Sequence, residues 1–111
     1  MKDRAVAVVV TERRVPPDAY TDVLLEAVTR DESRAHELIT QFSIDWPLNR
    51  MALIDRLVLT LATCELLMDD PPPTPVILDE AVELVKTYST DGSPAFVNGV
   101  LSSIAGALGK D

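Results

Sequence analysis

The apolar residues between Thr74 and Leu108 recur at steps of three and four, the spacing that places side chains on one face of an α-helix. Asp91-Gly92 interrupts this pattern with residues typical of a turn. Ser93 follows as a predicted N-cap, and Pro94 occupies the first helical position, where proline is tolerated best. The two stripes consist of Ile77, Ala81, Leu84, Val85 and Tyr88, and then of Phe96, Val97, Val100, Leu101, Ile104 and Leu108. Neither helix can bury its stripe alone, so the sequence predicts a helical hairpin packed on a third element.

The same periodicity continues upstream, and it predicts an all-α bundle of about five helices with short connections. We expect one helix at 18–30 and a second one capped by Asp31 or Ser33. Their apolar sides consist of Tyr20, Val23, Leu24, Ala27 and Val28, and then of Ala35, Leu38, Ile39 and Phe42. Residues 1–17 form a divergent N-terminal segment that favours helix and strand about equally. The helical domain is therefore expected at 18–111.

A longer helix is expected from Asn49 or Arg50 to about Met68, and its wide apolar side indicates the central position in the bundle. That side consists of Leu53, Ile54, Leu57, Val58, Leu61, Cys64 and Met68. Asp69-Asp70-Pro71-Pro72-Pro73 ends the helix, because proline cannot continue it, and forms an extended spacer.

Composition limits the chemistry of the chain. The formal net charge is −8, which argues against strong unaided nucleic-acid binding, because phosphate neutralisation by Lys and Arg supplies most non-specific affinity. One histidine (His36) and one cysteine (Cys64) cannot close a zinc site or a disulfide, and we expect no metal, no cofactor and no catalytic residue. No apolar run is long enough to span a bilayer. These features predict a cytoplasmic, non-enzymatic protein with no membrane contact.

Five positions carry individual predictions. Trp46, which Pro47 pushes out of helical geometry, is expected to anchor the core at a helix junction. Glu65 lies close to the buried stripe and would need a partner such as a helix N-terminus, a tyrosine hydroxyl or an arginine. Asn98-Gly99 would let another backbone approach closely, with a role in packing or in function. Phe96 either fills the core or stacks on a base.

Four segments resemble the NusB family of bacterial antitermination factors in residues, order and spacing. They are WPLNR at 46–50, IDRLVLTLATCELL at 54–67, DEAVELVKTY at 79–88 and SPAFVNGVL at 93–101. The resemblance implies an all-helical, NusB-like bundle. It also implies that the chain binds boxA-type RNA of ribosomal RNA leader transcripts together with a NusE-type small-subunit ribosomal protein, within the RNA polymerase complex.

The resemblance also implies where RNA is contacted. The family's basic N-terminal segment corresponds to Lys2 and Arg4, its acidic position to Asp55, and its aromatic near the last turn to Phe96. Asp91 lies one position away from the family's acidic residue in that turn. These five residues are the predicted RNA contacts, and RNA binding is expected to be weak or dependent on the partner protein.

The chain also departs from the family pattern. Thr60 stands where the family generally has arginine, Cys64 where it favours tyrosine, and the N-terminal segment is short and poor in arginine. These departures leave two alternatives open. One is a NusB-fold module for homodimerisation or protein interaction without RNA binding. The other is a relative of the NusB-like domain that precedes some ribosomal-RNA methyltransferases.

Overall fold

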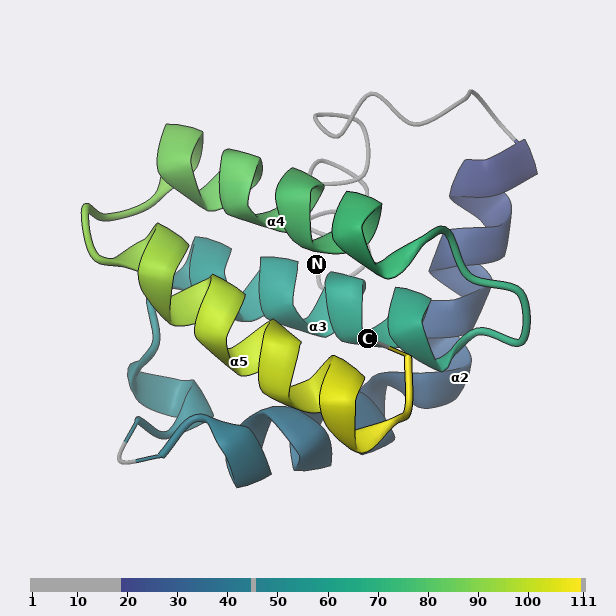
Figure 1. Cartoon of the computed structure of the whole chain (residues 1–111), viewed down its shortest axis with the longest axis horizontal. Coiled ribbons are helices and arrows are strands. Elements are labelled where there is room, and N and C mark those ends of the chain that lie inside the picture. Colours follow the sequence, from purple (N-terminus) through teal and green to yellow (C-terminus); the bar gives the residue numbers. More distant parts are fainter. Residues whose placement is uncertain (1–18, 45, 111) are drawn as a thin grey trace.

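The computed structural model describes residues 19–44 and 46–110, and within these ranges the chain is entirely helical (Figure 1). Helix α2 (Ala19–Phe42) is followed by a short 3-10 helix, η1 (Leu48–Arg50). Helices α3 (Leu53–Leu67), α4 (Thr74–Tyr88) and α5 (Ser93–Ala107) complete the order. The predicted all-α bundle is confirmed, whereas the predictions for residues 1–18 lie outside the described residues.

Helix α3 is the centre of the bundle, as the sequence predicted. It packs against α2, α4 and α5, and every residue from Val58 to Leu66 is buried. A helix that is buried on all sides must be apolar nearly all round, which explains the width of its stripe. Its start differs from the prediction, because Met51 and Ala52 have extended backbones (ψ 149° and 142°) that separate η1 from α3. Met51 is buried, whereas Leu53, predicted to be buried, is 55% exposed.

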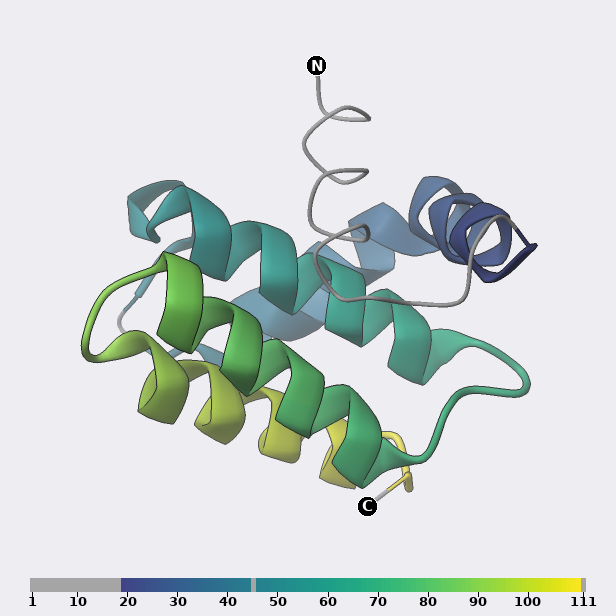
Figure 2. The same cartoon turned by 90° about the horizontal axis from the view of Figure 1, so that it is seen from above.

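Helix α2 corrects the prediction of two helices divided near Asp31. It runs without interruption from Ala19 to Phe42, because this stretch contains no proline or glycine that would end it. The helix is nevertheless bent: its first part descends along one side of the bundle and its second part turns beneath it (Figures 1 and 2). The Thr29 hydroxyl donates a 3.0 Å hydrogen bond to the Leu25 carbonyl oxygen, a contact that commonly bends helices.

Helices α4 and α5 form the predicted hairpin and lie side by side against α3 (Figure 2). Ile77, Ala81 and Val85 of α4 are buried, as are Val97 and Leu101 of α5. The hairpin thereby buries both stripes at once, which neither helix could do in isolation. Asn98 and Gly99 are exposed on α5, and nothing lies within 4 Å of a Cβ placed at Gly99. Close packing against another part of the described chain therefore does not explain this pair.

The chain after α5 folds back onto the end of α3. Gly109 adopts a positive φ of 70°, which turns the backbone and brings Lys110 to the spacer between α3 and α4. The Lys110 ammonium donates to the carbonyl oxygens of Leu66 and, at 2.9 Å, of Met68. The Thr74 hydroxyl donates to the Lys110 carbonyl oxygen. We call this group of contacts the C-terminal clasp; it satisfies carbonyls that the end of α3 leaves without helical partners.

Candidate nucleic-acid interface

One end of the bundle brings together three elements (Figure 1, left). They are the start of α3, the turn between α4 and α5, and the connector between α2 and α3, residues 43–52, which contains η1. The turn consists of residues 89–92, between Tyr88 and Ser93. Three of the predicted RNA contacts, Asp55, Asp91 and Phe96, lie on these elements. Lys2 and Arg4 fall outside the described residues.

Asp55 ties α3 to the α4–α5 turn. It lies in the first turn of α3, where the helix dipole favours a negative charge, and only 7% of its surface is exposed. Its Oδ1 accepts a 2.7 Å hydrogen bond from the Ser89 hydroxyl, and its Oδ2 accepts a 2.8 Å hydrogen bond from the Ser93 hydroxyl. Both carboxylate oxygens are therefore engaged with protein groups, and the side chain is buried beneath the turn.

Ser93 is the second member of this network, and it does not cap α5 as the sequence predicted. Gly92 is at the N-cap position, without a side-chain cap hydrogen bond. The Ser93 hydroxyl instead donates to Asp55 and accepts a 3.2 Å hydrogen bond from the Thr90 backbone N–H. The Ser93 N–H donates to the Thr90 carbonyl oxygen at 3.0 Å. We call residues 89–93, held in this way, the anchored turn.

Sequence reasoning missed the anchored turn because its partners are distant along the chain. Ser89 and Ser93 lie 34 and 38 positions from Asp55, and spacing of that size carries no signal in a single sequence. The sequence gives only a weak indication of this network: Ser89 and Ser93, four residues apart, flank Asp91-Gly92 and could both donate to one acceptor. Ser93 is almost fully buried. A buried hydroxyl needs a partner, and that partner is Asp55.

Asp91 and Phe96 differ in their exposure to solvent. Asp91 is exposed in the turn, where nothing in the described chain covers it. Phe96 is partly buried in the first turns of α5 and packs against the core cluster. The core-filling interpretation of Phe96 thus holds for part of the ring, while the remaining surface stays accessible. RNA contact by Asp55, Asp91 and Phe96 stays a prediction.

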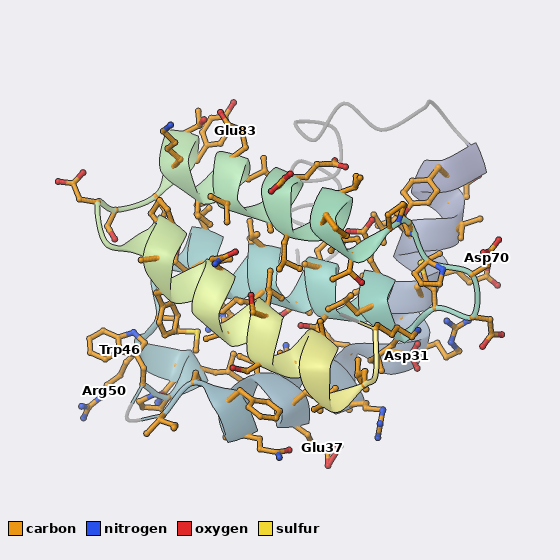
Figure 3. All side chains as sticks on the ribbon, in the orientation of Figure 1. Asp31, Glu37, Trp46, Arg50, Asp70 and Glu83 are labelled. Carbon is orange, nitrogen blue, oxygen red and sulfur yellow. The ribbon has the colours of Figure 1, made fainter. Side chains whose placement is uncertain are left out.

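Trp46 does not anchor the core, which corrects the sequence prediction. Half of its surface (50%) is exposed, and Figure 3 shows it projecting from the same end of the molecule as Arg50. Buried Ser43 and Met51 occupy the inner positions of the connector instead. Ile44, 80% exposed, also lies at this junction. Pro47 was correctly expected to exclude Trp46 from a helix, but this says nothing about which side of the connector faces the core.

Glu65 lies in the C-terminal half of α3, away from this end, and its predicted need for a partner is confirmed. The carboxylate is buried, and its Oε2 accepts a 2.6 Å hydrogen bond from the Tyr20 hydroxyl of α2. A tyrosine hydroxyl was one of the three partners expected. This contact joins the first turn of α2 to α3, so Glu65 has a structural role in holding the bundle.

Cations without ion pairs among the described residues lie near the anchored turn, together with the exposed carboxylates of Asp91 and Glu83 (Figure 3). Arg50, Arg56 and Lys86 lie on η1, the first turns of α3 and the last turn of α4, close to the anchored turn, and no ion pair involves them within the described ranges. Asp31 and Asp70 lie toward the other side (Figure 3). There, hydrogen bonding and charge attraction from Asp31, with smaller effects of Asp69 and Glu26, raise the pKa of Arg30 above its ordinary value.

The single cysteine of the chain lies in the core. Cys64 is buried in α3, and desolvation raises the pKa of its thiol to about 12, so the reactive thiolate is scarce near neutral pH. No group of three or more His, Cys, Asp or Glu side chains within 19–44 and 46–110 is placed to hold a metal ion. In the same ranges, no helix is long and apolar enough to cross a membrane.

The described residues thus form a small all-helical bundle with a polar turn fixed at one end. The model of the NusB family matches residues 7–106. The fold is similar to the solved structure of T. maritima NusB, with a TM-score of 0.76 and 30% sequence identity. The superposed region covers 95% of this chain and 85% of the T. maritima chain. The chain belongs to the NusB family.

Curated relatives agree with this assignment. The transcription antitermination protein NusB of Streptomyces avermitilis is 48% identical over 95 residues, which is 85% of this chain and 66% of that protein. The protein of the same name from Saccharopolyspora erythraea is 53% identical over 93 residues, 82% of this chain and 62% of the relative. The chain thus spans slightly less than two thirds of the length of these two relatives.

Proposed function

We propose that this chain is a NusB-type transcription antitermination factor that acts in the cytoplasm as a non-enzymatic adaptor. It binds boxA-type ribosomal RNA leader sequence together with a NusE-type small-subunit ribosomal protein, as part of the RNA polymerase complex. The observation that carries this proposal is the similarity to proteins named transcription antitermination protein NusB across more than four fifths of the chain. The chain's departures from the family pattern affect the strength of RNA binding rather than the fold.

The anchored turn supports a role in binding. Ser93 is hydrogen-bonded to buried Asp55 and accepts from the Thr90 backbone N–H, and these contacts favour one conformation of the turn before a ligand arrives. A ligand that binds a preorganised loop does not have to order it, which improves affinity. Asp91 on the exposed side and the accessible edge of Phe96 offer a hydrogen-bond acceptor and an aromatic surface to an unpaired base. In this proposal Asp55 is a positioning residue, which acts on RNA through the turn.

The charge supports dependence on a partner. With a net charge of −8, the chain repels RNA as a whole, and attraction comes only from local cations such as Arg50, Arg56 and Lys86. A basic ribosomal protein that binds alongside would supply the missing positive charge. Lys2 and Arg4 would add to the same surface if the N-terminal segment 1–17 lies near it, and this arrangement stays a prediction, as does the domain boundary at 17/18.

The test is a titration of labelled boxA-type RNA at two salt concentrations, with and without the NusE-type ribosomal protein. We expect binding that requires the partner and weakens as salt rises, because phosphate contacts release counterions. A boxA-type RNA with scrambled sequence is the control for non-specific attraction. Absence of binding under all four conditions would refute the antitermination proposal.

The second candidate function is a NusB-fold module for dimerisation or protein interaction without RNA binding. The observation that favours it is the exposure of Ile44, Trp46 and Leu53 around the connector, combined with the negative net charge. Sedimentation equilibrium distinguishes the candidates, because this module would self-associate or bind the ribosomal protein while the RNA stays free.

A further inference from the structure

Trp46 is presented on a fixed support rather than on a loose loop. The Ser43 hydroxyl donates a 3.1 Å hydrogen bond to the Trp46 carbonyl oxygen, and the Trp46 N–H donates a 3.0 Å hydrogen bond to the Ser43 carbonyl oxygen. Ser43 itself is buried at the end of α2. Both backbone groups of Trp46 are therefore held by a residue of the core, while its indole projects outward (Figure 3).

Arg50 stands on the same side, in η1, one short turn farther along the chain (Figure 3). Its backbone N–H donates a 2.9 Å hydrogen bond to the Pro47 carbonyl oxygen, which fixes the 3-10 turn that carries it. The guanidinium is exposed and forms no ion pair within the part of the chain that the structure describes. An indole and an uncompensated guanidinium are thus held on neighbouring rigid supports.

We propose that Trp46 and Arg50 form a binding site for one unpaired RNA nucleotide, in which the base stacks on the indole and the guanidinium contacts the phosphate. Aromatic side chains bind unpaired bases by stacking, and arginine pairs with phosphate through its planar fork. The inference rests on the proposed function, since it extends the RNA surface from the anchored turn to the connector at the same end of the bundle.

The local charge favours RNA over a protein as the occupant. Tryptophan and arginine also occur in protein interfaces, so the residue types alone do not decide. The cations at this end, Arg50, Arg56 and Lys86, have no ion pair within the described ranges, although the exposed carboxylates Glu83 and Asp91 lie on elements of the same end. A chain with a net charge of −8 that leaves these cations without ion pairs among residues 19–44 and 46–110 offers them to an anionic partner. The exposed Ile44 and Leu53 would matter to an apolar protein partner and add nothing to base stacking, and this difference provides the controls.

The chain contains a single tryptophan, so its intrinsic fluorescence reports on this site alone. The experiment adds a boxA-type RNA oligonucleotide to the chain with the NusE-type protein bound, and follows RNA binding by anisotropy of the labelled RNA and stacking by quenching of the Trp46 emission. A tryptophan-free variant of the ribosomal protein keeps the signal specific. We expect quenching that follows the anisotropy curve and declines with salt.

Variants separate the site from its surroundings. Trp46→Ala should weaken RNA binding roughly 5- to 150-fold, the range that follows from loss of one stacked base, and Trp46→Phe should recover part of it. Arg50→Ala should lower the slope of log K against log salt by about 0.7, the value for one phosphate of a single strand, and Arg50→Lys should restore it. Ile44→Ala and Leu53→Ala are the matched apolar controls and should bind RNA normally.

RNA binding without a change in Trp46 emission, and unchanged by Trp46→Ala, would overturn this inference and leave the proposed function intact. Weaker capture of the ribosomal protein by the Trp46, Ile44 and Leu53 variants, with normal RNA affinity once that protein is saturating, would overturn it in favour of a protein-docking surface. Absence of RNA binding by the unmodified chain and its partner would refute the proposed function itself.

Discussion

Removing the Asp55 carboxylate should destabilise the bundle through the anchored turn. Asp55→Ala deprives the Ser93 hydroxyl, almost fully buried, and the partly exposed Ser89 hydroxyl of their acceptors. A hydrogen bond to a charged group contributes about 1.5–3 kcal/mol, and water can replace the carboxylate only at Ser89. We therefore expect the free energy of unfolding to fall by about 2–4 kcal/mol. Asp55→Asn keeps one acceptor oxygen and should lose roughly half of that.

Urea denaturation followed by far-UV circular dichroism measures this change. The matched control is Asp91→Asn, which alters an exposed carboxylate of the same turn, two residues after Ser89. This substitution should change stability by no more than about 0.5 kcal/mol. Hydrogen exchange adds local information, because the amides of residues 89–93 should lose protection before those of α3 in Asp55→Asn.

A double-mutant cycle tests whether Asp55 stabilises the bundle through Ser93, which the total loss of unfolding free energy does not show. If Asp55 acts through Ser93, the effect of Asp55→Ala should be much smaller in a Ser93→Ala background, with a coupling of about 1–2 kcal/mol. Additive effects of the two substitutions, or a stability of Asp55→Ala within about 0.5 kcal/mol of the unmodified chain, would refute the argument. The same variants should lose RNA affinity in proportion to the loss of amide protection, since Asp55 is proposed to position the turn.

Three further predictions concern the core and the C-terminal clasp. Lys110→Ala removes the ammonium that donates to the carbonyl oxygens at the end of α3. The free energy of unfolding, measured by urea denaturation, should fall by about 1–3 kcal/mol, whereas the control Lys86→Ala should have almost no effect. Tyr20→Phe removes the hydroxyl donor of buried Glu65 and should cost about 1–3 kcal/mol in the same assay; an unchanged midpoint would contradict the structural role of that contact. Because the pKa of the Cys64 thiol is raised from 9.0 to about 12, the native chain at pH 8 should resist iodoacetamide, and mass spectrometry should detect labelling only when urea unfolds it. The folded state holds this proton more tightly than the unfolded state, so the contribution of Cys64 to stability is present below pH 9.0 and is lost as pH rises toward about 12.

Periodicity in the sequence was sufficient for the elements and for the central position of α3. Periodicity did not predict where a helix starts or whether two helical segments join, because the same residue types are compatible with either outcome. Leu53 continues the apolar stripe of α3, yet the extended Met51-Ala52 backbone shifts the helix start and leaves Leu53 exposed. Asp31 and Ser33 have the chemistry of helix caps, but without a proline or glycine nearby the backbone continues as one bent helix.

The candidate site was predictable only in part, for a related reason. Asp55, Asp91 and Phe96 were selected through the family resemblance, and the structure places them on elements that meet at one end of the bundle. Local rules assigned Ser93 to capping its own helix, because they do not include a carboxylate 38 positions away. Glu65 was the favourable case: a buried carboxylate needs a donor, and the physical requirement identified a tyrosine hydroxyl as one of three partners before its position was known.

The contacts at the two ends of α3 together determine how the α4–α5 hairpin can move. At one end Asp55 holds the turn through Ser93, and at the other Lys110 and Thr74 fasten the start of α4 and the chain after α5. A slip of the hairpin along α3 by one helical turn, about 5.4 Å, would break both sets of polar contacts as well as the core packing. Two directional polar fastenings, one at each end, exclude that translation and define a single register. Release of either one would leave the hairpin to pivot about the other, so the direction of any such motion is set by which fastening opens first.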